Sequence, residues 1–277
     1  MRRLLVFFLL VFLVTWVSWL AWARLIGPWR WALFYVGVFA PALVALLMTW
    51  LDSGDSGVRA LVRPLVRWDV PVRWYVFALG FMAAVKLIAA AMVRLTTGAW
   101  PPFGATPFVV LFAGAVLSTL VGGQAGEELG WRGYALPRLA EHVGFRLAAM
   151  VIGGIWATWH LPLFYLPGGD LIGQSFPVFV LLVIAISLAI TWLYVNTGGS
   201  LLLTMLFHAA VNNTTAIVPS ASTARGGPMS VSTSRMGWWT LVVLGAAGIA
   251  CLVALPAGGF FDATDSRFTM RESKTRD

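Results

Sequence analysis

Long apolar runs constrain this chain more than any other feature. Each approaches the roughly 20 residues that a helix needs to span a bilayer. Apolar residues make up 60% of the chain and charged residues only 11%, against about 25% charged residues in soluble domains. Because a helix satisfies its own backbone hydrogen bonds in lipid, we predict an all-α, polytopic membrane helical bundle of about eight transmembrane helices. The runs are Leu4–Ala23, Trp31–Leu51, Trp74–Val93, Phe108–Ala125, Leu147–Leu166, Phe176–Val195, Leu201–Val218 and Met236–Leu255.

The connections between these runs are short, which argues against any separate soluble domain. We therefore expect a single transmembrane domain over residues 1–277, with residues 256–277 as a cytoplasmic tail. The first run resembles a signal peptide, since Arg2 and Arg3 precede it and an A-x-A-like site, 21–23, ends it. At about 20 residues it exceeds the usual apolar region of 7–15 residues. We interpret it as an uncleaved first helix.

The Lys and Arg residues predict the orientation of the bundle. If the N-terminus lies inside, thirteen of the 19 fall on the cytoplasmic side, five fall outside and Lys86 lies within a run. Cytoplasmic loops carry such an excess of positive charge, so we predict that both termini are cytoplasmic. The outer five are Arg24, Arg30, Arg94, Arg225 and Arg235.

The net charge of +8 does not indicate a nucleic-acid partner, because the basic residues mostly flank apolar runs. This placement suits an anionic lipid surface, so we expect the lipid bilayer as a partner and no nucleic acid. Cys251 is the only cysteine, which excludes an intrachain disulfide, and we interpret it as a small buried apolar residue.

A few polar residues fall within or beside the runs, where ionisable groups are costly and therefore point to function. Glu128 and Arg132 are four residues apart and share a helix face, so they can pair. Glu127 points about 100° away from Glu128 and stays free for chemistry. His208 and Asn212 also share a face. With His160 on another run, these are the parts of a hydrolytic site: a base, a histidine partner and donors for an oxyanion.

The helical rise gives depths for these groups in the predicted topology. Glu127 and His208 fall about 12 Å from the cytoplasmic side, and His160 about 20 Å. Helix tilt absorbs only part of this difference, and an interfacial start of the helix that carries His160, or local freedom at Pro162, could absorb the rest. We expect the resulting cavity to open toward the cytoplasm.

Three motifs in order carry a family resemblance. They are Glu127-Glu128-x-x-x-Arg132, Trp156-x-x-x-His160 and His208-x-x-x-Asn212. They resemble the motifs of the CAAX-protease and bacteriocin-processing family (CPBP, or ABI), which are intramembrane glutamic endopeptidases. The resemblance covers about residues 108–213, the expected catalytic core. One departure is Trp156, where the family often has Phe.

The resemblance implies roles for individual residues. Glu127 would act as general base on a water that His160 holds and polarises. His208 and Asn212 would form the oxyanion hole, and Glu128 and Arg132 would support the site. It implies no metal and no cofactor, and a membrane-associated or lipidated protein or peptide as substrate. We expect a multi-pass protein of the plasma membrane; nothing in the sequence indicates its oligomeric state.

Three other functions remain open from the residues alone. Glu127, His160 and His208 are types that bind Zn²⁺, so a metal-dependent intramembrane protease is one, although no H-E-x-x-H motif is present. A proton-coupled transporter could use the same groups as a relay, and a non-proteolytic scaffold could keep the fold. Of the remaining polar residues, we interpret Asn213 as interhelical hydrogen bonding, Lys86 as snorkelling or paired, and His142 as part of a solvated loop.

Overall fold

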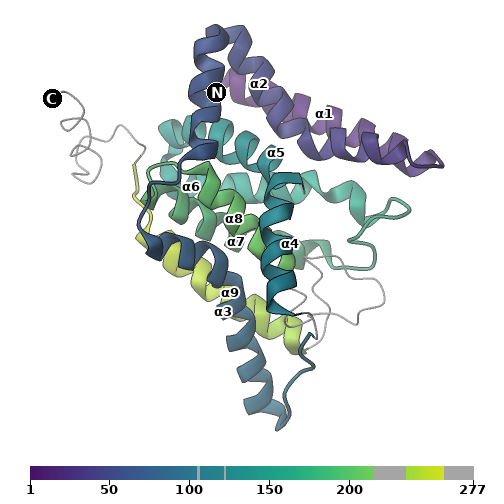
Figure 1. Cartoon of the computed structure of the whole chain (residues 1–277), viewed down its shortest axis with the longest axis vertical. Coiled ribbons are helices and arrows are strands. Elements are labelled where there is room, and N and C mark those ends of the chain that lie inside the picture. The colour runs from purple at the N-terminus through teal and green to yellow at the C-terminus, as the bar shows by residue number, and fades with distance from the viewer. Residues whose placement is uncertain (105–106, 122, 215–234, 259–277) are drawn as a thin grey trace, which may run out of the picture.

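The computed structural model is built of helices alone in the part of the chain that it describes (Figure 1). It describes residues 1–104, 107–121, 123–214 and 235–258. Arg225, the end of the run Leu201–Val218 and the predicted tail from residue 259 onward lie outside these residues. The elements are α1 (Arg2–Arg24), α2 (Arg30–Val62), η1 (Arg63–Val66), α3 (Val72–Thr97), α4 (Phe108–Val121), α5 (Gln124–Glu128), η2 (Leu129–Ala135), α6 (Leu136–Trp159), η3 (Leu161–Phe164), α7 (Phe176–Asn196), α8 (Leu201–Asn213) and α9 (Arg235–Ala254).

The predicted polytopic helical bundle is confirmed, and the helices differ from the prediction in number and length. Among the described residues, six helical stretches are long and apolar enough to cross a membrane, and α8 is a shorter apolar helix. The run Phe108–Ala125 does not continue as one helix, because α4 ends at Val121 and a new helix begins at Gln124. Gly123 makes this break with a φ of 98°, a value that only glycine adopts freely.

A second break divides the long helical stretch from Gln124 to Trp159. Gly144 has a φ of 72° and a ψ of 164°, so the chain turns there. A Cβ at this position would lie 1.8 Å from the carbonyl oxygen of Ala257, which leaves room for glycine alone. His142 precedes this turn on α6 and lies in a helix, not in the loop that we predicted. It is exposed.

Contacts between distant segments identify one side of the bundle. The Met1 amino group lies 3.3 Å from Nε2 of His142, and Arg3 pairs with Asp52 at 2.5 Å. Arg146 donates to the carbonyl of Leu255 at 2.8 Å. The N-terminus and the end of α9 therefore lie on the same side, which is the Arg-rich side of the sequence prediction.

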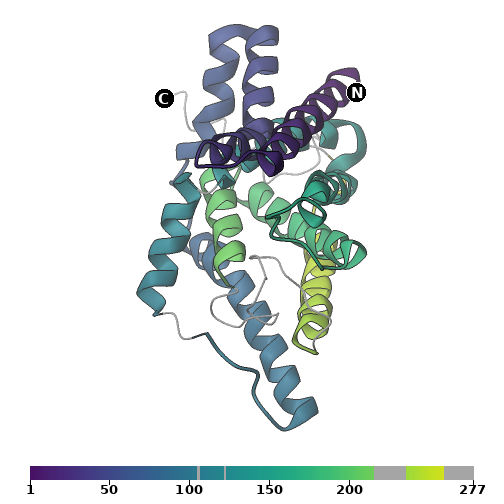
Figure 2. The same ribbon diagram turned by 90° about the vertical axis from the view of Figure 1, so that its right-hand side faces the viewer.

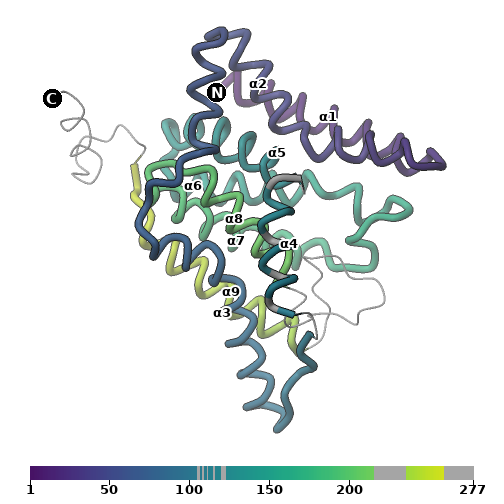
Figure 3. Tube along the Cα trace, viewed as in Figure 1, coloured from purple at the N-terminus to yellow at the C-terminus, as the bar shows by residue number. Residues whose placement is uncertain are grey.

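The helices form two groups around the middle of the molecule (Figure 2). The α1–α2 hairpin packs on α5 and η2, while α3 and α9 pack on α8 and α7 (Figure 3). Glycines allow the closest approaches: a Cβ on Gly130 would lie 2.3 Å from Cβ of Pro41, and one on Gly153 would lie 2.8 Å from Cα of Ile184. Small residues at such crossings let membrane helices pack by van der Waals contact.

Candidate active site

Residues from all three motifs line one cavity of about 190 Å³. Glu127 comes from α5, His160 from the end of α6, and His208 and Asn212 from α8. The sequence-derived depths left their convergence open, and the structure brings all four to the same space. Its other lining residues are mostly apolar: Trp19, Phe34, Val38, Trp156, Trp159, Leu163, Asp170, Leu171 and Phe179.

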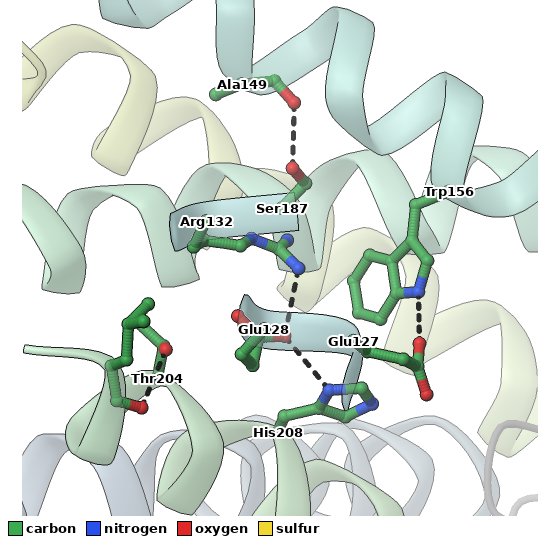
Figure 4. Close-up of polar contacts among 9 residues, drawn as sticks. Glu127, Glu128, Arg132, Ala149, Trp156, Ser187, Thr204 and His208 are labelled. Carbon is green, nitrogen blue, oxygen red and sulfur yellow. Dashed lines mark hydrogen bonds and ion pairs between the residues drawn. The ribbon is translucent and has the colours of Figure 1, made fainter. Parts of the chain in front are cut away.

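The adjacent carboxylates face different neighbours, as the helical spacing predicts (Figure 4). Glu128 accepts a hydrogen bond from Arg132 at 3.0 Å, and both side chains are fully buried. This confirms the pairing across one helical turn. Arg132 lies in η2, a π-helical stretch, and such irregular turns are frequent at functional sites. A buried pair of this kind supports the site only while both partners are present.

His208 also bonds to Glu128, a contact that the sequence did not indicate. Its Nδ1 lies 3.0 Å from the same Oε1 that Arg132 contacts. A carboxylate only accepts hydrogen bonds, so Nδ1 carries the proton. The bond fixes the imidazole ring, and Nε2 remains for the cavity that His208 lines.

Glu127 is held by an indole. The Nε1–H of Trp156 donates to Oε2 of Glu127 at 2.6 Å. Figure 4 shows the second carboxylate oxygen pointing away from the indole. Glu127 is 7% exposed, so it is buried but reaches the cavity. The motif spacing includes Trp156 but did not predict its hydrogen bond to Glu127.

His160 is oriented by the same residue. Its Nδ1 lies 2.9 Å from the backbone carbonyl oxygen of Trp156. A carbonyl only accepts, so Nδ1 donates and Nε2 of the neutral ring is an acceptor. Aromatic rings surround the imidazole, including Trp159 at 4.7 Å and Phe179 at 5.5 Å between centroids.

Two polar residues near the motifs have other places. Asn213 donates to Oγ of Ser118 at 3.1 Å and to the carbonyl of Ala209 at 2.8 Å, so it links α8 to α4 as we predicted. Lys86 is 2% exposed on α3 and is not among the residues that line the cavity.

Several residues that line the cavity come from helix ends opposite Met1. Trp19 is near the end of α1, Phe34 near the start of α2 and Phe179 near the start of α7, so these residues lie away from the Met1 side. The opening of the cavity toward the cytoplasm stays a prediction. Helix α8 has 13 residues, a length of about 20 Å. Counting from Leu201 therefore carries His208 beyond the middle of α8.

The walls of the cavity include residues that belong to none of the three motifs. Trp19 and Phe34 come from the first two helices, and Asp170 and Leu171 come from the connection between α6 and α7. Burial by surrounding protein raises the pKa of Asp170 above its usual value, although part of its surface is open to solvent. No spacing rule connects these segments with the motifs, so only the fold could reveal them.

The arrangement can also be compared with a metal site. In the described part of the chain, no three His, Cys, Asp or Glu side chains are grouped as metal ligands would be. Glu127, His160 and His208 thus share a cavity without forming a ready ligand set. A carboxylate, two imidazoles and an amide around a mostly apolar cavity suit general acid–base chemistry on a bound molecule.

The fold and the cavity define a class of protein, a polytopic membrane protein with a buried carboxylate–histidine site. Residues 106–214 match a family described as type II CAAX prenyl endopeptidase Rce1-like. The chain is also 25% identical over 226 residues to the CAAX prenyl protease 2 of Methanococcus maripaludis, an alignment that covers 74% of this chain and 81% of that protein. These matches support the resemblance to the CAAX-protease and bacteriocin-processing family that the three motifs indicated. The matched family and this relative are both named as peptidases.

Proposed function

We propose that this chain hydrolyses a peptide bond near the C-terminus of a membrane-associated, prenylated protein, without a metal ion. One observation carries the proposal: Glu127, His160, His208 and Asn212 line the same cavity. The name of the Methanococcus maripaludis relative supports the substrate class. We further propose the plasma membrane as the location of this multi-pass protein.

The first step is the activation of water. Glu127 takes a proton from a water molecule, and Nε2 of His160 accepts a hydrogen bond from the same water and orients it. The bonds from Trp156 to Glu127 and His160 support this geometry, since they leave one carboxylate oxygen and one ring nitrogen for the water. The water oxygen then attacks the carbonyl carbon of the substrate.

The second step needs stabilisation of the negative oxygen that forms. His208 donates from Nε2, and Asn212 donates from its side-chain amide. With Nδ1 bonded to Glu128, His208 donates from Nε2 in the doubly protonated form of the ring. Removing one donor of such a site typically slows a reaction by about 10²–10³-fold.

The last step breaks the peptide bond. Glu127 passes its proton to the leaving amine nitrogen, the tetrahedral intermediate collapses, and the C–N bond breaks. The first products are a carboxylic acid on the protein and an amine on the released peptide. The second proton of the water then passes from the acid to the amine, which leaves a carboxylate and an ammonium group. Glu127 ends as a carboxylate, so atoms and charge balance over the cycle.

Replacement of Glu127 by Gln tests this proposal. We expect Glu127→Gln to lower cleavage by at least about 10²-fold, the usual contribution of general acid–base catalysis. The matched control is Glu141→Gln, which removes an exposed carboxylate from α6. Purified proteins with equal melting temperatures would be mixed with prenylated and unprenylated forms of one peptide, and new termini would be mapped by mass spectrometry.

Each outcome of this comparison has a meaning. Cleavage by wild type and Glu141→Gln, but not by Glu127→Gln, supports the proposed base, and chelator resistance supports a metal-free reaction. Equal cleavage by Glu127→Gln would refute the role of Glu127. Equal cleavage of both peptides would refute the requirement for a prenyl group.

A further inference from the structure

Trp156 contacts four other motif residues: Glu127, His160, Arg132 and His208. Its indole N–H donates to Glu127 at 2.6 Å, and its backbone carbonyl lies 2.9 Å from Nδ1 of His160. Its ring stacks beneath Arg132, with the guanidinium carbon 4.5 Å from the ring centroid, and meets the ring of His208 edge-on at 5.0 Å.

The bond to Glu127 has the geometry of a strong interaction. At 2.6 Å it is short for an N–H to oxygen bond, and bonds to an ionised acceptor are the shorter and stronger ones. Trp156 is 1% exposed and Glu127 is 7% exposed, so water competes little for either group. An indole nitrogen only donates, so this contact is good for a carboxylate and poor for a protonated acid whose hydrogen points at it.

We propose that Trp156 is a positioning residue that holds Glu127 in the ionised form and aims its free oxygen at the water. The proposal rests on the proposed function, in which Glu127 is the base. A phenylalanine at position 156 would keep the ring contacts and lose the hydrogen bond. The tryptophan therefore supplies an N–H donor to Glu127 that phenylalanine lacks.

A purely structural role for Trp156 makes a different prediction. Packing against Arg132 and His208 needs only the aromatic ring, and Trp156→Phe retains most of it. A folding defect would lower the fraction of active protein and would lower the cleavage rate by the same factor at every pH. Loss of the hydrogen bond acts on the protonation of Glu127, because the bond favours the charged form. The pH profile therefore separates the two roles.

The enzymatic test compares Trp156→Phe with Trp16→Phe. The Trp16→Phe substitution also removes an indole hydrogen bond to α6, because Nε1 of Trp16 donates to the carbonyl of Trp159 at 3.1 Å. This bond does not involve Glu127. For Trp156→Phe we expect kcat/KM to fall by about 10- to 100-fold, the range for a hydrogen bond to a charged group. The acid limb of its profile should move to higher pH.

The other titratable groups around Glu127 stay in place in this variant. They are Glu128 and Arg132 on the same helical stretch, His160 directly after α6, His208 on α8 and Asp170 in the connection between α6 and α7. The Trp16→Phe profile should keep the shape of the wild-type profile. An unshifted acid limb in Trp156→Phe, whatever the rate, would overturn the proposal.

A second measurement tests the bond without any turnover. In protein labelled with ¹⁵N-tryptophan, the indole resonance that disappears in Trp156→Phe belongs to Trp156. We expect this resonance to shift in Glu127→Gln and to titrate with pH in wild type, while that of Trp16 does neither. An indole resonance unaffected by Glu127→Gln would refute the bond. If wild type failed to cleave while the resonance behaved as expected, the proposed function would fail and the contact would stand.

Discussion

At the scale of residues, two neighbouring carboxylates have different surroundings because successive helical positions diverge by about 100°. Glu128 lies between Arg132 and His208 at 3.0 Å from each, whereas Glu127 meets an indole and the cavity. The sequence predicted the pair of Glu128 and Arg132 from their spacing. It could not predict the contact with His208, since 80 residues separate the two partners.

Removal of Arg132 should destabilise the protein strongly. Arg132→Met leaves Glu128 buried without its cation, and breaking a buried pair in this way costs about 3–5 kcal/mol. The control Arg138→Met removes a partly buried arginine that donates to the carbonyl of Tyr134, and about 1 kcal/mol is expected for that bond. Denaturant unfolding in detergent would compare them, and similar losses for both would contradict a special role of the buried pair.

Replacing both partners of the buried pair should cost less stability than replacing Arg132 alone. Glu128→Gln combined with Arg132→Met removes both charges of the pair, so the double variant should be more stable than Arg132→Met alone, because residue 128 no longer carries a buried charge that lacks its arginine. The same unfolding measurement checks it. A double variant that loses the sum of both single effects would show that the two charges do not act on one another.

At the scale of elements, the breaks in the helices decide where the motifs lie. Gly123 starts the helix that carries Glu127, and Gly144 turns the chain so that α6 carries His160 to the cavity. The apolar runs predicted most helices within a few residues. They did not predict these breaks, because nothing in the sequence distinguishes Gly123 or Gly144 from a glycine inside a helix, and the φ of each becomes evident only in the fold.

Gly144→Ala should disrupt the turn in α6. A Cβ there would meet the carbonyl oxygen of Ala257 at 1.8 Å, and a positive φ costs a non-glycine residue roughly 1–2 kcal/mol before any clash. Gly154→Ala is the control, since nothing lies within 4 Å of its added Cβ. We expect a clear fall in melting temperature for the first and none for the second; equal melting temperatures would argue against the turn.

At the scale of the whole molecule, the bundle separates an Arg-rich side from the side that is nearer the cavity. Met1, Asp52 and Leu255 mark the first side through their contacts, and Asp170 and Leu171 belong to the second. The cavity wall from α1 also gives the first helix a place in the site, through Trp19. The arginine tally alone did not indicate this position of the cavity.

Single-cysteine labelling tests the orientation of the bundle. Cys251 is the only native cysteine, so a Cys251→Ala background accepts one new cysteine at a time. Ser56 is exposed beyond Asp52, and Ser175 is exposed before α7. An impermeant reagent should label Ser56→Cys only from the cytoplasmic side and Ser175→Cys only from the other. Labelling of Ser56→Cys in intact cells would reverse the predicted orientation.

The sequence by itself determined the class of the molecule and the residues of its site. Twenty-residue apolar runs admit few solutions in lipid, and buried ionisable groups are too costly to persist without a use. The tertiary structure decided the partners of those groups: Trp156 for Glu127, His208 for Glu128, and the aromatic walls from α1 and α2. The spacing of residues along one helix can be read from the sequence. Contacts between residues far apart in the sequence depend on where helices break, cross and end, and the packing of the whole bundle decides those positions.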